Sequence, residues 1–375
     1  MYAIVANGFA DGPAEALRDY LVARDADVLT VFHPLTPEHG KKHVVTRYGN
    51  GRRVDERSIA LPLRPPLSFA LDPLVPLLPP HVDTWFGFNP LACARGLLAR
   101  RLGRARSVVL WSVDFVPDRF GTSTIPTRIY DGLDRLCCTR ADARVELSEA
   151  ARDARNLRHA LGGATAPTYV VPMGAWLERV PKTPADGFVG RRVVFLGHLV
   201  LRQGVDVLLD ALAVVKNRGG DVRADVIGTG PLEQQLRQRL AELGLDDSVR
   251  FHGFVTDHRD VERLLAEAAI AVAPYRPGED TFTAYADPGK LKAYLAAGLP
   301  ILLTDVPPNA KTLARDAGAE LVPYDAEAIA TAIMNGLSSP EGWRERRAAA
   351  LAYVTRFDWE ALLGDLLEQL QLPVR

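Results

Sequence analysis

The stretch from Tyr285 to Lys292 has the make-up of an anion site at the start of a helix. Asp287 is a good N-cap residue and Pro288 suits the first helical turn. The N–H groups of Gly289 to Leu291 would then face a ligand, and the helix dipole and two lysines would favour a phosphate. A plainer alternative is that these residues only begin a helix whose lysines face water.

Composition narrows the class of protein. The chain has 375 residues, of which 47% are hydrophobic and 24% charged, so we expect a soluble globular protein with room for two domains. The formal net charge of -1 is far from the basic balance of a nucleic-acid-binding domain. We therefore expect no nucleic-acid partner.

Cysteine usage and the first residues predict the compartment. Cys93, Cys137 and Cys138 are too few for a disulfide framework, and no Cys-x-x-Cys or His-Glu-x-x-His spacing occurs. We expect a reducing cytoplasm and no bound metal. The chain opens on the apolar run Tyr2 to Ala6 without a signal-peptide pattern, so we expect the mature protein to begin here.

Short apolar runs alternate with helical patterns, which is typical of parallel sheets covered by helices. Expected strands lie at 2–7, 28–32, 82–86, 108–111 and 168–171, and again at 193–196, 224–227, 249–251, 270–273 and 301–303. We predict two doubly wound Rossmann-like domains, residues 1–175 and 190–355, and a helix in 356–375 that packs on one domain or across both. Tandem domains of this kind face a ligand-binding cleft.

Three familiar motifs fail on inspection. Neither Asn7 to Gly12 nor Gly228 to Glu233 has the spacing of a dinucleotide fingerprint. Gly289-Lys290 lacks the other residues of a P-loop, and Gly121 to Ile125 lacks the second glycine of a nucleophile elbow. These failures disfavour a redox enzyme, a P-loop NTPase and an acyl hydrolase.

The second half resembles the donor domain of a family 4 retaining glycosyltransferase of the GT-B fold. The resemblance rests on four ordered segments, Phe195 to Asp206, Val226 to Pro231, Val249 to Val255 and Pro288 to Pro300. In that family they hold the donor diphosphate, form a glycine turn, border the nucleotide base and bind phosphate, respectively. The first half resembles the acceptor domain in its topology, with the Asn7 to Pro13 loop placed near the donor phosphates.

The same resemblance exposes four departures. His198 stands where the family usually has Arg, and Gln203 where it usually has Lys. Tyr285 and Ala293 occupy the positions of the two glutamates that bind the donor sugar and ribose. One preorganised electrostatic contact is worth about 3 to 4 kcal/mol in a transition state, so catalysis requires that other side chains compensate.

Compensating side chains lie within the same segments. We expect Lys290, Arg202 and His198 to neutralise the departing diphosphate, and Asp114 to orient the acceptor or act as a base. The residues expected to bind substrates are Gly12, Gln203, Gly228, Gly230, Phe254, Glu279, Thr283, Tyr285, Asp287, Gly289, Leu291, Trp111 and Arg119. For His198, Gln203, Asp114, Trp111 and Arg119, ordinary structural roles are the alternative.

The expected activity is transfer of a sugar from a UDP- or GDP-sugar to an acceptor hydroxyl with retention, without a cofactor beyond the donor. Two alternatives stay open: a nucleotide-sugar-binding subunit that assists another transferase, and a GT-B sugar-nucleotide epimerase. The Arg95 to Arg106 segment could contact anionic lipid at the inner membrane face with its leucines turned inward, or be a helix end with solvated arginines.

Overall fold

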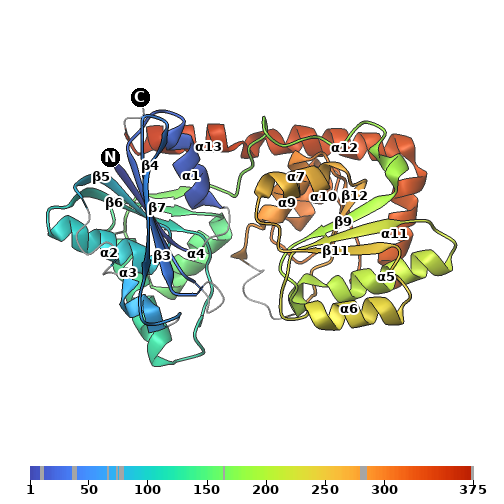
Figure 1. Ribbon diagram of the computed structural model, residues 1–375, viewed down its shortest axis with the longest axis horizontal. Helices are drawn as coiled ribbons and strands as arrows, with labels where there is room; N and C mark the ends of the chain where they lie inside the picture. Colours follow the sequence, from blue (N-terminus) through green and yellow to red (C-terminus); the bar gives the residue numbers. More distant parts are fainter. Residues whose placement is uncertain are drawn as a thin grey trace. The chain divides into compact units, whose positions relative to one another are not determined.

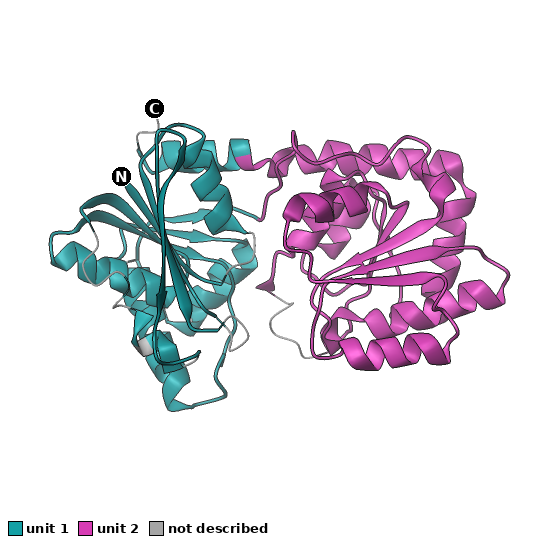
Figure 2. Cartoon of the chain, in the orientation of Figure 1, with its two compact units in different colours: residues 1–172, 360–375 teal, residues 173–359 magenta. Residues whose placement is uncertain are grey.

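The computed structural model describes residues 1–8, 12–35, 40–65, 67–72, 75, 80–163, 165–278 and 285–372. The chain divides into two compact units (Figure 2). Unit 1 comprises Met1–Pro172 and Glu360–Arg375, and unit 2 comprises Met173–Trp359. Each unit is an α/β structure built on a largely or wholly parallel sheet, so the predicted fold class is confirmed.

Unit 1 contains an eight-stranded sheet in the order β4-β3-β2-β1-β5-β6-β7-β8. Its strands are β1 (Tyr2–Asn7), β2 (Val28–His33), β3 (Lys42–Gly49), β4 (Arg52–Ala60), β5 (Val82–Gly87), β6 (Ala105–Ser112), β7 (Ala143–Glu146) and β8 (Thr168–Val170). Strands β1 and β2 are short apolar runs buried along nearly their whole length, as parallel strands covered on both faces should be. The predicted strands of this unit all exist.

The β3–β4 hairpin was missed. It pairs antiparallel with β2 at the edge of the sheet, and Asn50 and Gly51 form its turn with φ angles of 51° and 68°. An Asn-Gly pair is a strong hairpin signal because both central residues of the turn need positive φ. The signal was therefore present in the sequence.

The helices of unit 1 begin at recognisable caps. They are α1 (Pro13–Val22), α2 (Pro90–Arg101), α3 (Ile125–Arg140), α4 (Glu149–Arg158) and, from Glu360 onward, α13 (Trp359–Gln369), with a 3-10 turn η2 (Leu67–Ala70). Asn89, Thr124 and Ser148 each accept a hydrogen bond from the backbone N–H three residues later. These caps fix the residue at which each of the helices α2, α3 and α4 begins (Figure 1).

Unit 2 contains a six-stranded parallel sheet in the order β11-β10-β9-β12-β13-β14. Its strands are β9 (Arg192–Leu196), β10 (Arg223–Ile227), β11 (Val249–Gly253), β12 (Ile270–Ala273), β13 (Ile301–Leu303) and β14 (Glu320–Leu321). The five predicted strands are all present, and β14 adds a short edge. The sheet order reverses between β9 and β12, which is where doubly wound sheets bind ligands.

Helices cover both faces of this sheet (Figure 1). They are α5 (Val205–Asn217), α6 (Glu233–Glu242), α7 (His258–Ala266), α9 (Gly289–Ala296), α10 (Ala310–Asp316), α11 (Ala326–Ser338) and α12 (Pro340–Val354). One apolar cluster joins α5, α6 and α11 to the sheet, and a second joins α7, α9, α10 and α12. Helix α9 is thus held rigidly at the carboxyl end of β9.

Candidate functional site

Two loops at the carboxyl ends of β9 and β10 touch through their backbones. A Cβ atom on Gly228 would lie 2.0 Å from the carbonyl oxygen of Gly197, and one on Gly230 would lie 2.5 Å from that of Leu199. Gly228 also has a φ of 131°, which side chains rarely tolerate. Both predicted glycines therefore act by permitting this close approach, which leaves His198 exposed at the surface between them.

The turn after β9 brings Gln203 toward α9. The 3-10 turn η5 (Leu201–Gln203) ends at Gly204, where φ is 67° and a Cβ atom would lie 1.8 Å from the carbonyl oxygen of Pro274. Only glycine allows helix α5 to begin so close to the end of β12. As a result, Gln203 faces the first turn of a helix that lies far along the chain.

Lys290 is the cation at the centre of this site. Its Nζ donates a hydrogen bond of 2.6 Å to Oε1 of Gln203 and lies 4.5 Å and 4.3 Å from the ring centroids of Phe195 and Tyr275. It forms no ion pair with any residue that the structure describes. Burial lowers the pKa of Lys290 to about 7. The amide oxygen and the two aromatic rings contact the ammonium group of Lys290, but they carry no negative charge that would neutralise it.

The second lysine of the predicted anion site is not available to a ligand. Lys292 is only 1% exposed, and its ammonium group pairs with the carboxylate of Asp287. Asp287 also accepts a 2.8 Å hydrogen bond from the backbone N–H of Met173. A buried ammonium group needs a counter-ion, and Asp287 provides it. The prediction that Asp287 caps the helix is therefore wrong, and its contact with sugar hydroxyls stays a prediction.

Helix α9 begins one residue later than predicted. Pro288 is its N-cap residue rather than its first helical residue, and no side chain caps it. The N–H of Leu291 donates to the carbonyl oxygen of Pro288 at 3.1 Å, and its side chain is fully buried, so Leu291 does not serve a ligand. The first N–H groups, those of Gly289 and Lys290, lie at the open end of the helix.

Tyr294 was missed, although it fixes the whole arrangement. Its side chain is fully buried, and its hydroxyl oxygen accepts a 2.7 Å hydrogen bond from the backbone N–H of Leu196 at the end of β9. Burial raises the pKa of Tyr294, which keeps the hydroxyl neutral. Its position one helical turn after Lys290 was the available signal, since residues four apart share a helix face.

The remaining predicted donor-side residues border this site more loosely. Arg202 lies half-buried in η5, Tyr285 is half-buried before α9, and Phe254 is 66% exposed just after β11. Glu279 and Thr283 lie outside the described residues.

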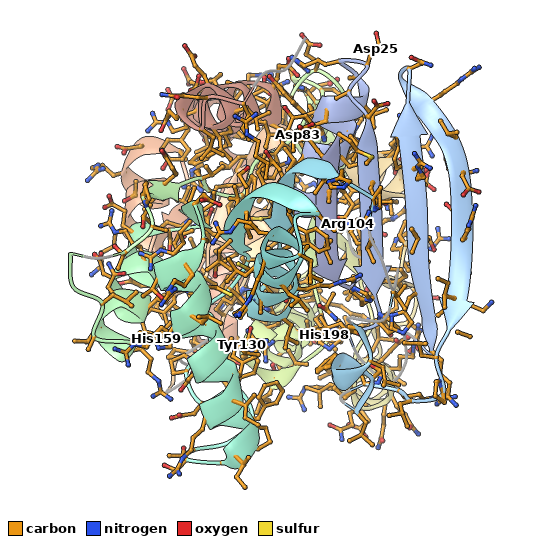
Figure 3. All side chains as sticks on the ribbon, turned by 90° about the vertical axis from the view of Figure 1, so that its left-hand side faces the viewer. Asp25, Asp83, Arg104, Tyr130, His159 and His198 are labelled. Atoms are coloured by element: carbon orange, nitrogen blue, oxygen red, sulfur yellow. The ribbon has the colours of Figure 1, made fainter. Side chains whose placement is uncertain are left out.

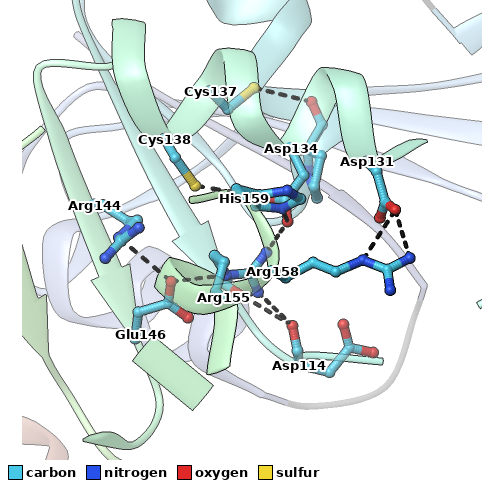
Figure 4. Close-up of polar contacts among 12 residues, drawn as sticks. Asp114, Asp131, Asp134, Cys137, Cys138, Arg144, Glu146, Arg155, Arg158 and His159 are labelled. Carbon is cyan, nitrogen blue, oxygen red and sulfur yellow. Dashed lines mark hydrogen bonds and ion pairs between the residues drawn. The ribbon is translucent and has the colours of Figure 1, made fainter. Parts of the chain in front are cut away.

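In unit 1 the structure brings Asp114 and Arg119 together. An Nη2 hydrogen of Arg119 is donated to Oδ1 of Asp114, and the guanidinium carbon lies 5.5 Å from the ring centroid of Tyr130. Tyr130 lies on α3 (Figure 3). The backbone carbonyl of Asp114 accepts hydrogen bonds from Ser112 and Arg155, both 2.8 Å long. These two hydrogen bonds fix the loop that follows β6 (Figure 4).

Arg155 is the centre of a buried ionic cluster (Figure 4). It contacts the carboxylates of Asp134 and Glu146, the latter at 2.8 Å, and Asp134 also lies 2.8 Å from Nε2 of His159. Burial alone would lower the pKa of Arg155, but Asp134 and Glu146 outweigh it and the net pKa is raised. The positive charge of Arg155 is paired with carboxylates of the same unit, so we assign the cluster a structural role.

In unit 1 the prediction for Trp111 needs revision, whereas that for Gly12 stays a prediction. Trp111 has no exposed surface and stacks on Phe88 with ring centroids 5.0 Å apart, so it does not border an acceptor in this structure. A tryptophan on a central strand is covered by the helices on that face. Gly12 is the N-cap residue of α1 with an extended φ of -170°, a conformation open to any residue.

A family model described as "Glycosyl transferases group 1" matches residues 190–339, the part of unit 2 that contains this site. A curated relative, the GDP-mannose-dependent alpha-(1-6)-phosphatidylinositol dimannoside mannosyltransferase of Mycobacterium tuberculosis, is 32% identical over 245 residues. Residues 190–339 thus belong with the group 1 glycosyl transferases, and the chain is similar to family 4 glycosyltransferases.

The chain aligns with only part of its curated relatives. The match covers 63% of this chain and 57% of the M. tuberculosis protein. The phosphatidyl-myo-inositol mannosyltransferase of Mycobacterium leprae is 29% identical over 252 residues, which cover 66% of this chain and 63% of that protein. The chain thus spans less than two thirds of the length of either relative.

Solved structures confirm the predicted GT-B fold. Sucrose-phosphate synthase from Thermosynechococcus elongatus superposes with a TM-score of 0.72 at 18% identity, covering 98% of both chains. HepE of Anabaena in complex with UDP-glucose superposes with a TM-score of 0.67 at 17% identity, covering 99% of both chains. At this identity the likeness establishes the fold alone.

Unit 1 also contains an apolar cavity of about 660 Å³. Its lining comes mainly from η2, α2 and α3 and includes Leu91, Leu98, Ile125, Ile129 and Leu133. Several of these side chains reach the surface, with Ile125 73% and Ile129 60% exposed. The cavity is therefore open to an apolar ligand from outside.

In the Arg-rich segment the prediction that the leucines turn inward is wrong for two of them, whereas Arg101 and Arg106 are exposed at and beyond the end of α2, as the alternative predicts. Leu98 and Leu102 are 51% and 61% exposed, whereas Arg95 is buried and donates to the carbonyl oxygens of Asp72 and Val75. Arg100 pairs with Asp142 at 2.5 Å. These buried carbonyls attract Arg95 inward and leave leucines at the surface. Across the residues placed by the structure, no helix is long and apolar enough to cross a membrane.

Proposed function

We propose that this chain transfers a hexosyl group from a nucleoside diphosphate sugar to an acceptor hydroxyl with retention of anomeric configuration. The observation that carries the proposal is Lys290, a half-buried cation at the N-terminus of α9 whose polar partner is the neutral amide of Gln203. Such a cation is ready to receive an anion. The family that the chain resembles acts on donors that carry a diphosphate.

The chemistry asked of this site is charge stabilisation. When the bond between the anomeric carbon and the diphosphate oxygen breaks, negative charge collects on the leaving phosphate while the sugar becomes oxocarbenium-like. Lys290 and the N–H groups that open α9 would bind that charge, with Arg202 and His198 as further cations. The acceptor oxygen then bonds to the anomeric carbon on the same face, and its proton passes to the leaving diphosphate. No step in this scheme uses a metal.

The donor base is proposed from the comparisons. The M. tuberculosis relative is named as dependent on GDP-mannose, and HepE was solved with UDP-glucose. We propose a GDP- or UDP-hexose, whose base would stack near the exposed ring of Phe254. With Tyr285 and Ala293 at the positions of the family's glutamates, sugar hydroxyls would be bound through fewer charged contacts.

The acceptor is proposed to carry a lipid portion. The M. tuberculosis and M. leprae relatives are named for phosphatidylinositol acceptors, and unit 1 contains the apolar cavity lined by α2 and α3. An acyl or isoprenoid chain in that cavity would bury apolar surface at about 25 cal/mol per Å². The Asp114–Arg119 pair would orient a polar head group. A cytoplasmic location at the inner membrane face suits such an acceptor, and three buried free thiols are compatible with it.

A second candidate is a nucleotide-sugar-binding subunit without turnover of its own. The observation that favours it is the loss of both glutamates and of the usual Arg and Lys at His198 and Gln203. An epimerase, which needs donor but no acceptor, is a third possibility.

The test begins with a thermal-shift screen of UDP-, GDP-, ADP- and TDP-sugars, since ligand at 100 times its dissociation constant adds about 2.7 kcal/mol of stability. The stabilising donor is then incubated with the protein, with and without a lipid-linked polyol, and products are followed by proton NMR. An α-linked product from an α-linked donor supports the proposal. Binding without release of nucleotide favours the subunit, a changed sugar on an intact donor favours the epimerase, and no binding refutes all three.

A further inference from the structure

His33, His43 and Asp72 lie close together in the interior of unit 1, although they come from three separate segments of the chain. His33 ends β2 and His43 lies opposite it on β3, directly after the Phe32–Val44 pair, while Asp72 follows η2. The three residues are 1%, 0% and 5% exposed. Among the residues that the structure describes, they form a group of possible metal ligands whose atoms all lie within 4.8 Å of one another.

The geometry of the three ligand atoms fits a first-row metal ion. The two Nδ1 atoms are 2.8 Å apart, and each lies 3.7 Å from Oδ1 of Asp72. The circumcentre of a triangle with sides of 2.8, 3.7 and 3.7 Å lies about 2.0 Å from each corner. Zinc binds imidazole nitrogen at about 2.0 to 2.1 Å and carboxylate oxygen at about 2.0 to 2.2 Å.

Hydrogen bonding alone leaves this cluster incompletely satisfied. The two facing Nδ1 atoms can share only one hydrogen, and Oδ1 of Asp72 has no hydrogen-bond partner among the described residues although it is buried. Buried polar atoms are normally paired, so an unpaired carboxylate oxygen aimed at two imidazoles points to a ligand between them. A cation there would engage both Nδ1 lone pairs and that oxygen at once.

The surroundings hold the carboxylate in the orientation that a metal requires. Nδ2 of Asn7 donates to Oδ2 of Asp72 at 2.9 Å, and Nδ2 of Asn89 donates to Oδ1 of Asn7 at 2.8 Å. Such outer contacts fix metal ligands and tune their affinity. The nearby Arg95 directs its guanidinium to the carbonyl oxygens of Asp72 and Val75 instead.

We propose that His33, His43 and Asp72 bind one divalent transition-metal ion of the zinc class. The metal ties the β3–β4 hairpin and the segment after η2 to the centre of the sheet. Asn7, His33 and Asp72 also line the apolar cavity, so a fourth coordination position opens toward it. Three protein ligands with one open position are the pattern of accessible zinc sites. The site is independent of the proposed transfer reaction, which uses residues of unit 2.

The test is metal binding by the full-length, tag-free protein after chelator treatment. We expect one Zn²⁺ per chain in a competition titration with a chromophoric chelator, and a rise in the unfolding temperature on adding Zn²⁺. His43→Ala should weaken binding by 100-fold or more and Asn7→Ala by about 10- to 100-fold. His81→Ala, which removes an exposed histidine of the same unit, is the matched control and should bind as the parent does.

X-ray absorption on the zinc-loaded parent protein decides the case even if a variant fails to fold. Two imidazole ligands and a carboxylate oxygen at about 2.0 Å support the proposal. It is overturned if the parent binds less than one equivalent, if the absorption spectrum shows fewer than two imidazoles, or if His43→Ala and His81→Ala bind zinc equally well.

Discussion

The N-terminus of α9 in unit 2 and the Arg155 cluster in unit 1 both bury positive charge, but they treat it differently. Arg155 contacts two carboxylates, those of Asp134 and Glu146, within the fold (Figure 4). Lys290 instead contacts a neutral amide and two aromatic rings. The first region leaves no charge for a ligand, whereas the second leaves one positive charge to be neutralised from outside.

The two lysines of α9 repeat this contrast within a single helix turn. Lys292 is paired with Asp287 and serves the fold, while Lys290 has no carboxylate partner in the described part of the chain. A buried charge is costly unless it is paired, so an unpaired one persists where function requires it. The contrast supports the proposal that Lys290 is the ligand-directed group, and it shows Lys292 in a structural ion pair.

The largest expected effect is on stability, from breaking the paired region. Arg155→Ala would remove the cation shared by Asp134 and Glu146 and leave only the contacts with His159 and Arg144, and breaking a buried pair typically costs about 3 to 5 kcal/mol. Chemical denaturation followed by circular dichroism should show an earlier unfolding transition. Arg152→Ala removes an arginine from the solvent-facing side of the same helix and is the control. Equal midpoints for both variants would show that the cluster is not structural.

Next comes the unpaired region, where the effect falls on activity. Lys290→Ala should lower turnover with the identified donor by roughly 100-fold or more, because it removes a preorganised charge at the leaving group. Its unfolding midpoint should stay close to that of the parent. Lys311→Ala, on an exposed lysine of α10, should retain full activity. If Lys290→Ala keeps activity within a few-fold, the leaving group is stabilised elsewhere.

The pH dependence of nucleotide binding tests the same lysine without removing it. Burial lowers the pKa of Lys290 to about 7, so the free protein loses this charge as the pH rises through 7. The affinity for a nucleoside diphosphate should then fall by up to about tenfold per pH unit above 7, until the pKa of the complex is reached. Calorimetric titrations from pH 6 to 9 measure it.

Lys290→Arg is the control for that titration, since its guanidinium stays protonated and its affinity should be nearly flat with pH. The free energy of unfolding changes with pH in the opposite direction to the nucleotide affinity. The unfolded chain keeps this proton up to pH 10.5, so the ligand-free parent should gain stability between pH 7 and 10.5 relative to Lys290→Gln. Parallel pH profiles for parent and Lys290→Gln would contradict the assigned pKa.

Local patterns were enough to predict much of the fold and part of the site. Apolar runs located β9 to β13, because a buried parallel strand is a nearly continuous apolar run. The binding roles that the resemblance implies for Gly228, Gly230 and Lys290 stay predictions. Local sequence patterns do not predict which side chains pair across the fold. The Lys292–Asp287 ion pair overturned the N-cap prediction, and Asn50-Gly51 was a readable signal that was overlooked.

The cluster of His33, His43 and Asp72 shows most clearly what sequence patterns do not predict. His33 and His43 face each other only because β2 and β3 pair antiparallel, and Asp72 joins them from a separate turn. No ligand spacing of a known metal motif connects the three, so motif searching could only predict that no metal binds. Tertiary contacts between distant segments create such sites, and a pattern of neighbouring residues does not contain them.

The smallest expected effect comes from the amide that holds Lys290 in place. Gln203→Ala removes the 2.6 Å hydrogen bond to its Nζ, and loss of one such bond is worth about 1 kcal/mol, or about fivefold in nucleotide affinity. Gln235→Ala, on exposed helix α6, is the control for titration calorimetry. A loss as large as that of Lys290→Ala would mean that the amide itself binds the diphosphate. In that case Gln203 would replace the family's lysine as a direct ligand, and the unpaired charge on Lys290 would no longer be sufficient to explain donor binding.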